Sequence, residues 1–329
     1  MSGYPDIRLR RLRRTESLRR MFDLALPGPE KFIWPAFVLG GTGINEPIDA
    51  MPGQSRLSVD RLLKEVEGIV DQGIGGILLF GLVEESSKDN SGTASYADDG
   101  AVQNAVRELR RAFPDLVIAT DVCLCAYTHH GHCGPLAGDG SVDNDAANTM
   151  LAKVAISHAS AGADIVAPSA MMDGQVVAIR QALDANGFEK NIVMSYSTKF
   201  ASAMYGPFRE AERSSPQKGD RRGYQVSYGD LRQALRESAH DEDEGADILM
   251  VKPALFYLDV ISCIADESDL PIAAYNVSGE YSMLIATSEK GWGNLHDMVR
   301  ESMTAMVRAG ADILISYWAS RYREFFDKE

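Results

Sequence analysis

Residues 245–253 read G-A-D-I-L-M-V-K-P, and the tripeptide that opens this stretch recurs at residues 162–164 and 310–312. Each copy follows a helix-like segment and leads into a short apolar run, I-V, I-L-M or I-L-I. A glycine just past a helix readily adopts the left-handed backbone conformation that ends the helix. The tripeptide therefore predicts a repeated junction at which a helix stops and a buried strand starts.

Apolar runs of this kind recur roughly every forty residues and predict eight strands: Phe32–Val38, Gly76–Gly81, Leu116–Val122, Asp164–Pro168, Ile192–Tyr196, Asp247–Val251, Ile272–Val277 and Asp312–Tyr317. Amphipathic helical patterns lie between them, among them Val59–Gln72, Val102–Phe113, Asn148–Ala161, Tyr228–Glu244 and Asn294–Ala309. Strands that alternate with helices form parallel βαβ units, and eight units favour a closed (β/α)8 TIM barrel. An open doubly wound sheet is the alternative, but no glycine-rich phosphate fingerprint follows the first strand.

The composition predicts one catalytic domain, residues 31–329, preceded by an N-terminal arm, residues 1–30. The chain has 329 residues, 45% of them hydrophobic, which suits a single α/β barrel with a large core. It has neither an apolar run of about eighteen residues nor a signal-peptide pattern, so we expect a cytoplasmic protein and no membrane partner. Four cysteines in such a chain favour metal binding or catalysis over disulfides.

The arm is basic, whereas the chain as a whole has a net charge of −14. An acidic body repels phosphate backbones, so we expect no nucleic acid partner for it. Seven arginines crowd the arm: Arg8, Arg10, Arg11, Arg13, Arg14, Arg19 and Arg20. Such an arm can bind nucleic acid or anionic lipid, or dock on an acidic neighbouring subunit; the acidic body favours subunit docking.

Reactive side chains stand at the predicted strand ends, where barrels of this kind build their active sites. Lys252 ends an apolar strand and precedes Pro253, so we expect its amine among apolar walls. Loss of hydration lowers the pKa of a lysine and leaves a neutral amine that can form a Schiff base with a carbonyl. Lys199 ends the previous strand region and is predicted to be its neighbour. Asp121, Ser169, Ser278 and Tyr317 stand at other strand ends.

The segment from about 200 to 225 contains no convincing strand and begins directly after Lys199. Long loops of this kind are commonly active-site lids, so we predict a lid here. A disordered insertion is the alternative.

A cysteine cluster, Cys123, Cys125 and Cys133, follows the third predicted strand. Residues two apart in an extended segment face the same side, and a turn through Gly131 can return Cys133 to the same ion. Three thiolates leave one open position on a tetrahedral zinc, which is a catalytic arrangement. A fourth ligand from His129, His130 or His132 would instead make a closed structural site. Cys263 is expected to be a core residue.

The sequence resembles the 5-aminolevulinate dehydratase family, also called porphobilinogen synthase, over essentially its whole length. Six motifs carry the resemblance: D-V-C-L-C-A-Y-T-H-H-G-H-C-G at 121–134, A-P-S-A-M-M-D-G at 167–174, Y-S-T-K-F-A-S-A-M-Y-G-P-F-R-E-A at 196–211, K-G-D-R-R at 218–222, M-V-K-P-A at 250–254 and V-S-G-E-Y at 277–281. The resemblance implies condensation of two 5-aminolevulinate molecules to porphobilinogen, with loss of two waters, in tetrapyrrole (heme) biosynthesis.

The resemblance also implies roles for individual residues. Lys252 and Lys199 match the lysines that hold the first and second substrates, and Ser278 and Tyr317 match the binders of the first carboxylate. The lid groups that clamp the second carboxylate are matched by Arg209, Arg221 and Gln225, with Arg222 as the alternative if the register shifts by one.

The resemblance finally implies cofactors and assembly. The three cysteines place the chain in the zinc-using branch. Glu237, in an R-E-S segment, matches an activating magnesium site, with a solvated acidic helix end as the alternative. The arm resembles one that embraces a neighbour in a homo-octamer. The rival readings are a class I aldolase-like Schiff-base barrel and a non-catalytic zinc-holding or RNA-binding scaffold.

Overall fold

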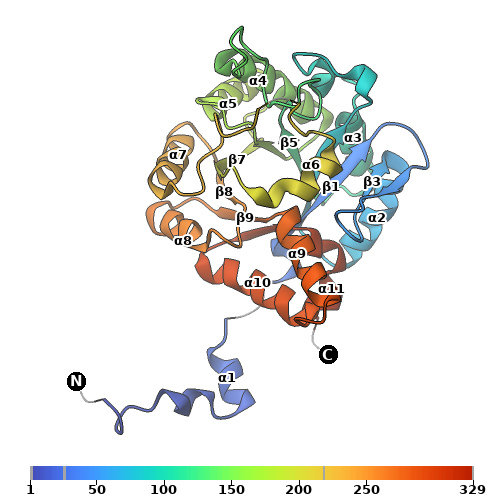
Figure 1. The fold of residues 1–329 in the computed structure, drawn as a ribbon. Coiled ribbons are helices and arrows are strands. Elements are labelled where there is room, and N and C mark those ends of the chain that lie inside the picture. Colours follow the sequence, from blue (N-terminus) through green and yellow to red (C-terminus); the bar gives the residue numbers. More distant parts are fainter. Residues whose placement is uncertain (1–2, 25–26, 218, 328–329) are drawn as a thin grey trace.

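The computed structural model describes residues 3–24, 27–217 and 219–327, and these residues form ten strands in one sheet. Eight parallel strands follow one another around the sheet: β1 (Phe32–Leu39), β4 (Gly76–Leu82), β5 (Val117–Val122), β6 (Ile165–Pro168), β7 (Ile192–Lys199), β8 (Ile248–Lys252), β9 (Ile272–Asn276) and β10 (Ile313–Ser316). Pairing of β10 with β1 closes the ring, which confirms the barrel and excludes an open sheet (Figure 1). The remaining two strands, β2 (Asn45–Pro47) and β3 (Ser55–Ser58), form an antiparallel hairpin beside β1.

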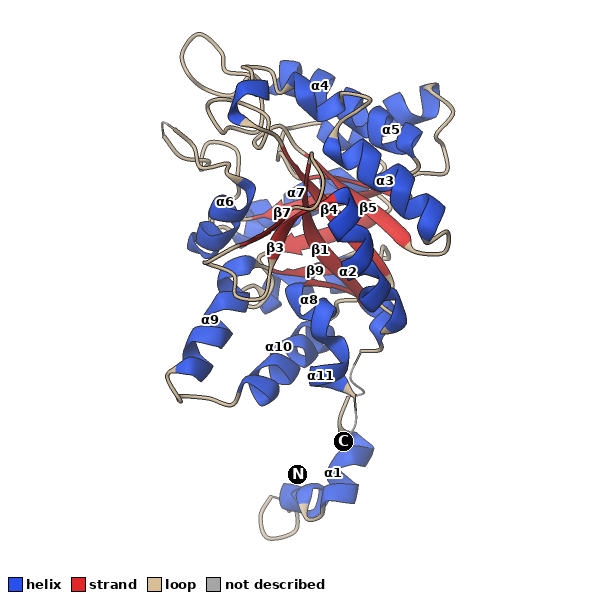
Figure 2. Ribbon diagram, turned by 90° about the vertical axis from the view of Figure 1, so that its right-hand side faces the viewer, coloured by secondary structure: helices blue, strands red, loops and turns tan. Residues whose placement is uncertain are grey.

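Helices surround the barrel and leave its strands in the middle (Figures 1 and 2). They are α2 (Val59–Asp71), α3 (Ala101–Ala112), α4 (Asn144–Ala161), α5 (Gln175–Ala185), α7 (Leu231–Asp243), α8 (Leu258–Glu267), α9 (Ser278–Glu289), α10 (Leu295–Ala309) and α11 (Tyr322–Phe326). One further helix, α6 (Gly206–Glu212), covers one end of the barrel instead of its side (Figures 1 and 2).

The repeated tripeptide forms the predicted junction at each of its three positions. Its glycines Gly162, Gly245 and Gly310 have φ of 108°, 99° and 119°, a left-handed conformation that glycine adopts without a Cβ clash. The aspartate that follows does more than start a strand. Its carboxylate accepts a hydrogen bond, of 2.8–3.0 Å, from the backbone N–H of one residue in the neighbouring strand. The backbone N–H of the aspartate donates in return to the carbonyl of that neighbouring residue. The pairs are Asp164 with Ile118, Asp247 with Val193 and Asp312 with Ile272.

Some boundaries differ from the predicted ones. Strand β7 runs three residues beyond the predicted end and includes Lys199, with a shift of register between Ser195 and Thr198. Helix α4 begins at Asn144, where Asp143 caps it, so it starts earlier than the sequence pattern predicts. The segment predicted to be an irregular lid contains α6, a seven-residue helix that begins at Gly206-Pro207.

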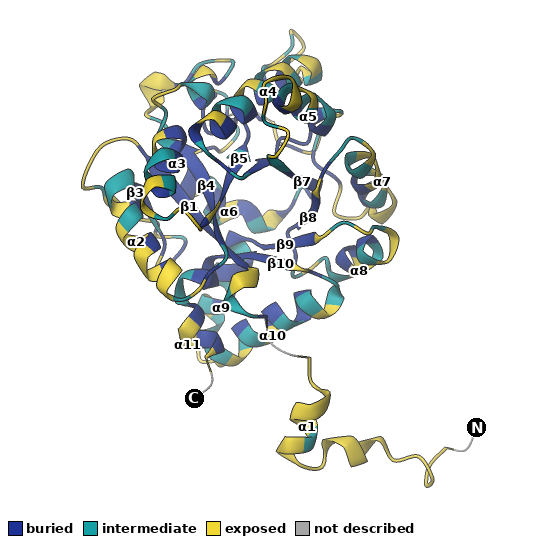
Figure 3. Cartoon of the chain, turned by 180° about the vertical axis from the view of Figure 1, so that it is seen from behind, coloured by how far each residue is buried: buried dark blue, intermediate teal, exposed yellow. Residues whose placement is uncertain are grey.

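The barrel strands are buried, whereas the arm is exposed along nearly all of its described length (Figure 3). The arm contains a short 3₁₀ helix, Leu9–Arg13, and α1 (Glu16–Phe22), and it extends away from the barrel (Figures 1 and 2). Met1, Ser2, Ala25, Leu26 and Lys218, which belong to the predicted arm and to the K-G-D-R-R motif, lie outside the described residues. No helix in the described ranges has the length and apolar character needed to span a membrane.

Candidate active site

Lys252 is the last residue of β8, and its side chain is buried inside the barrel mouth. Its Nζ lies 4.0 Å from the ring centroid of Tyr275, 4.7 Å from that of Phe208 and 4.9 Å from that of Tyr196. Burial lowers the pKa of Lys252 to about 7, and the positive charge of Lys199 adds to this effect. About half of the Lys252 amines are therefore neutral and nucleophilic near pH 7.

Lys199 ends β7 directly beside Lys252, because the two residues are register partners in neighbouring strands. Its Nζ donates a hydrogen bond of 2.5 Å to the backbone carbonyl of Ser169 and lies 5.5 Å from the Tyr196 ring. Ser169 is buried just after β6, and its carbonyl makes the contact with the lysine. Lys199, Lys252 and Ser169 are thus brought together, as the strand-end argument predicted.

Asp121 lies in β5, its Oδ1 atom is buried, and its carboxyl interacts electrostatically with both lysines. Burial raises the pKa of its carboxyl to about 7, with a further upward effect from Glu212, while the charges of Lys199 and Lys252 oppose the rise. Its Oδ1 has no hydrogen-bond partner among the described residues. A buried carboxyl with a free oxygen, close to two amines, can exchange protons with a bound ligand.

The three predicted metal-binding cysteines come together at the end of β5. The sulfur atoms of Cys123, Cys125 and Cys133 lie within 4.8 Å of one another, and Cys123 Sγ is 3.4 Å from Cys125 Sγ. All three are buried and form no disulfide. Gly131, with φ of 71°, makes the turn that returns Cys133, as the sequence predicted. Buried thiols so close together suit one thiolate-binding ion such as zinc, whose bonds to sulfur are about 2.3 Å long.

The histidines near the cluster do not complete it. Among the described residues the metal-sized group consists of the three cysteines. His130 contacts the Asn90 carbonyl, and His132 Nδ1 lies 3.2 Å from the Tyr224 hydroxyl. The closed structural site with a histidine ligand therefore has no support from the geometry. Cys263 lies on α8 and is only partly buried, so it is not the core residue that its apolar neighbours predicted.

The predicted carboxylate clamp consists of Arg209, Arg221 and Gln225. All three residues line one cavity of about 540 Å³. Arg221 is buried and donates hydrogen bonds to the carbonyls of Gly131 and Ser214. The Nε atoms of both arginines and both amide atoms of Gln225 are buried without a partner among the described residues. Unpaired buried donors that line one cavity suit an anionic ligand.

Arg222, the alternative by one position of register, is exposed and pairs with Asp220. Burial lowers the pKa of the Arg209 guanidinium, and the charge of Arg221 contributes to the same shift. The two arginines thus repel each other in this structure. A carboxylate placed between them would relieve that repulsion.

Ser278 and Tyr317 lie on the other side of Lys252. Ser278 begins α9, and its Oγ accepts a hydrogen bond of 2.9 Å from the backbone N–H of Phe208 in α6. Tyr317 follows β10, and its hydroxyl is 3.3 Å from that of Tyr275, the ring closest to the Lys252 amine. Both residues are fully buried. The structure thus brings them to the Lys252 side of the site.

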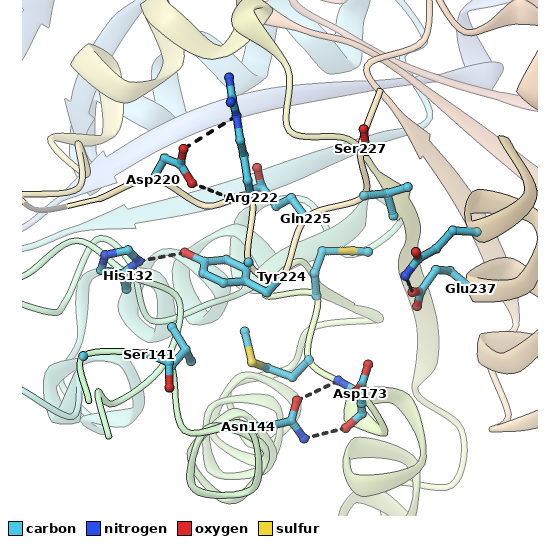
Figure 4. Close-up of a pocket in the computed structure, with 17 residues that line it drawn as sticks. His132, Ser141, Asn144, Asp173, Asp220, Arg222, Tyr224, Gln225, Ser227 and Glu237 are labelled. Atoms are coloured by element: carbon cyan, nitrogen blue, oxygen red, sulfur yellow. Dashed lines mark hydrogen bonds and ion pairs between the residues drawn. The ribbon is translucent and has the colours of Figure 1, made fainter. Parts of the chain in front are cut away.

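Glu237 lies apart from these residues, on the outer helix α7. It is partly buried, accepts a hydrogen bond from Gln233 and lines a second cavity of about 610 Å³ (Figure 4). Asp173 and Asp220 line the same cavity, but no metal-sized group of three ligand atoms includes Glu237 within the described ranges.

Sequence reasoning missed one buried carboxylate, Glu212, at the end of α6. Cys125 Sγ donates to its Oε2 over 3.3 Å, and the Ser214 hydroxyl donates to the same oxygen over 2.5 Å. Burial raises the pKa of the Glu212 carboxyl to about 8, and the charge of Cys125 adds to the rise. In sequence this glutamate stands in an ordinary charged run, E-A-E-R, which gives no signal of burial.

Comparisons with known proteins agree with this geometry. The family model for delta-aminolevulinic acid dehydratase matches residues 6–325. Delta-aminolevulinic acid dehydratases from Synechococcus elongatus and Archaeoglobus fulgidus are 49% and 48% identical to this chain, over 96% and 98% of it and 97% and 99% of their own lengths. The crystal structure of delta-aminolevulinic acid dehydratase (porphobilinogen synthase) from Toxoplasma gondii ME49, in complex with porphobilinogen, matches with a TM-score of 0.94 and 43% identity, covering 97% of this chain and 91% of that chain. Such similarity over nearly the full length shows that this chain belongs to the delta-aminolevulinic acid dehydratase family.

Proposed function

We propose that Lys252 and Lys199 carry the reaction of this family, in which two molecules of 5-aminolevulinate condense to porphobilinogen with loss of two waters. The observation that carries the proposal is the pair of buried lysines that end adjacent strands, one of them with a pKa of about 7. Each amine would attack the keto carbon of one substrate. The keto oxygen would leave as water, and a carbon–nitrogen double bond would link substrate to lysine.

Asp121 is assigned the proton transfers in these steps. Its carboxyl is buried, and its charge acts on both lysine amines. A protonated carboxyl in this position can give a proton to the departing hydroxyl, and the carboxylate can take one back from the carbon that forms the next bond. Ser169 has a positioning role in this scheme, because its carbonyl holds the amine of Lys199.

Two separate groups would hold the two substrate carboxylates. Ser278 and Tyr317 would hold the carboxylate of the substrate on Lys252, since both are buried near that lysine. Arg209, Arg221 and Gln225 would clamp the second carboxylate, since they line one cavity with unpaired donors. Charge-assisted bonds to an arginine pair would select an acidic substrate on an otherwise acidic protein.

Zinc is the metal we assign to Cys123, Cys125 and Cys133, because three close thiols form the soft donor set that it prefers. When bound, it supplies a Lewis acid beside the two lysines. We assign magnesium to the carboxylate of Glu237, which lines the cavity of about 610 Å³. This ion takes one or two carboxylates and keeps several waters, so a single glutamate meets its needs.

The arm supports a homo-oligomeric assembly, and we propose an octamer. Its exposed side chains combine arginines with large apolar residues, among them Ile7, Leu9 and Leu12. Such a surface suits an acidic neighbouring subunit. We also propose a cytoplasmic location, because the four cysteines are free thiols, as is usual in a reducing compartment.

Borohydride trapping tests the assignment of the lysines. Hydride reduces the carbon–nitrogen double bond to a stable secondary amine, so peptides from protein reduced with 5-aminolevulinate should carry the added mass on Lys252. Lys199→Ala should keep this adduct and make no porphobilinogen, whereas Lys190→Ala, at an exposed site, should behave as the unchanged protein.

If neither Lys252 nor Lys199 carries the added mass, the proposed Schiff-base mechanism is wrong. A Lys199→Ala enzyme that still makes porphobilinogen would show that one lysine suffices. That result would favour the class I aldolase-like reading, which needs a single amine.

A further inference from the structure

Glu212 is the feature that the assignments above leave without a role. It is 3% exposed, and it reaches the cysteine cluster from the lid helix α6, not from a barrel strand. Its Oε2 is 3.3 Å from the sulfur of Cys125. A glutamate is almost never buried unless it is paired or binds a metal. The side chain of Glu212 is hydrogen-bonded to the neutral hydroxyl of Ser214 and to the thiol of Cys125.

The backbone around Glu212 is bound by two buried cations from distant parts of the chain, Arg56 of β3 and Lys88. Arg56 donates to the carbonyls of Glu210 and Ala211 over 2.7 and 2.8 Å, and Lys88 donates to the carbonyl of Arg213 over 3.2 Å. These carbonyls lie at the C-terminal end of α6, where positive charges are favourable. The end of the lid helix, and with it the buried carboxylate, is therefore held in place against the cluster.

The spacing suits two ligands of one ion. Zinc bonds of about 2.3 Å to sulfur and about 2.0 Å to a carboxylate oxygen, at a tetrahedral angle, put sulfur and oxygen about 3.5 Å apart. The measured separation from Cys125 is 3.3 Å. Glu212 contacts the cluster at this one corner, because its oxygens are not among the ligand atoms that all lie within 4.8 Å of one another. Binding of an ion by all four groups therefore requires the carboxylate to rotate toward the three sulfurs.

The surrounding charges permit a fourth anion. Three thiolates and a carboxylate exceed the charge of a divalent ion by two, and an uncompensated excess would be costly in a buried site. Hydrogen bonds from the other two cysteines of the cluster lower the pKa of Cys133, and the positive charges of Arg221 and Lys199 lower it further. The charges of Glu212 and Cys125 partly oppose the lowering of the pKa of Lys252 by burial. Arg221 and Lys199 therefore supply two positive charges beside the four ligand candidates, which matches the excess of two negative charges.

We propose that Glu212 is a fourth ligand of the metal held by Cys123, Cys125 and Cys133, and that it closes the coordination sphere while no substrate is bound. The inference rests on the proposed metal centre. Because Glu212 lies on the lid helix, a substrate group that takes its place at the metal would also release one contact between lid and barrel. Substrate entry and lid position would thus be linked at a single residue.

Cobalt(II) is the probe for this proposal, since its visible spectrum reports the number and type of ligands. Full-length protein stripped of metal is loaded with cobalt, and its affinity is measured by competition with a chromophoric chelator. Glu212→Gln should weaken cobalt binding by about ten- to a hundred-fold, the range seen when supporting groups of metal sites are removed. Its d–d bands should also change. Glu210→Gln, on the exposed face of the same helix, should match the unchanged protein in both measurements.

A second variant covers the case in which Glu212→Gln fails to fold, as judged by melting of the metal-free protein. Glu212→Asp keeps the charge and nearly fills the same space, but it withdraws the oxygen by one methylene, so the same spectral change is expected. Unchanged affinity and spectrum in a folded Glu212 variant would overturn the proposal. A Cys123→Ala protein that binds cobalt as well as the unchanged chain would instead overturn the metal centre itself, so the two failures are distinguishable.

Discussion

Lys252 and Lys199 lie near the same aromatic ring, but their amines have different surroundings. The Nζ atoms of Lys252 and Lys199 lie 4.9 and 5.5 Å from the ring centroid of Tyr196. Lys252 is enclosed by aromatic side chains, whereas the amine of Lys199 is held by the carbonyl of Ser169. Lys252 therefore has the neutral, nucleophilic amine, and Lys199 contributes the charge that helps to keep it neutral.

The pKa of Lys252 gives a pH dependence with a definite sign. Below about pH 7 its amine is protonated and cannot attack, so the rate of adduct formation should fall about tenfold per pH unit and should level off above pH 7. An ordinary lysine would have fewer than about one neutral amine in a thousand at pH 7. The measurement is borohydride trapping of 5-aminolevulinate on Lys252 across a pH series.

Lys199→Ala separates the two causes of this shift. Removal of a positive neighbour should raise the pKa of Lys252 and move the midpoint to higher pH. Burial is the larger cause, so the midpoint should stay well below that of an exposed lysine. An identical midpoint in both proteins would contradict the electrostatic coupling of the two amines.

Residues at strand ends were predictable, whereas Glu212 was not. The sequence places Lys199, Lys252 and Asp121 on one rim because parallel strands of a barrel bring their carboxyl ends together. Glu212 lies at the end of a helix that is bound by Arg56, more than 150 residues earlier in the chain. No local pattern carries such a contact, so the fourth candidate ligand becomes visible only in three dimensions.

At the scale of elements, α6 connects the lid to three other parts of the fold. Its backbone is bound near its start by Ser278 of α9 and at its end by Arg56 of β3 and by Lys88. It carries Phe208, which contacts Lys252, and Arg209, which faces the clamp cavity. A seven-residue helix after Gly-Pro has little helical signal of its own, so tertiary contacts decide its formation and the sequence predicted only a loop.

Arg209→Ala tests the clamp, because the side chain of Arg209 lines the cavity and its loss leaves the bonds of α6 intact. A charge-assisted contact contributes about 1.5–3 kcal/mol, so binding of the second substrate should weaken by about one to two factors of ten. Steady-state kinetics over a range of 5-aminolevulinate concentrations measures this loss. Arg213→Ala is the matched control, since Arg213 is exposed, pairs with Glu46 and does not line this cavity.

Two results would count against the clamp. Unchanged substrate dependence in Arg209→Ala would show that the cavity does not hold the second carboxylate. An equal loss in Arg213→Ala would show that general positive charge on the lid, and not the buried pair, attracts the substrate.

At the scale of the whole molecule, charge and apolar surface are distributed unevenly. The chain has a net charge of −14, although seven of its arginines lie in the first twenty residues. The same arm exposes Met21 and Phe22 as well as the apolar residues of its 3₁₀ helix. A segment that is both basic and apolar, and that extends from an acidic barrel, has the properties of a contact surface for a second copy of the chain (Figure 3).

Removal of residues 1–24 should therefore reduce the size of the assembly and leave the barrel folded. The described strands and helices of the barrel bury their own core without the arm, so circular dichroism should be unchanged. Mass from light scattering after gel filtration should fall relative to the full chain. Leu9→Ser with Leu12→Ser, which keeps every arginine, should lower the mass in the same direction because docking also needs the apolar side chains.

Salt and RNA discriminate between the readings of the arm. If the arm docks on acidic subunits, higher salt should weaken the assembly of the full chain, because exposed charge pairs are screened. If it binds RNA instead, truncation should abolish salt-sensitive retention of RNA and leave the mass of the assembly unchanged. If the truncated protein still forms an assembly with the mass of eight subunits, the arm is not part of the interface. The octamer would then require contacts between the barrels themselves.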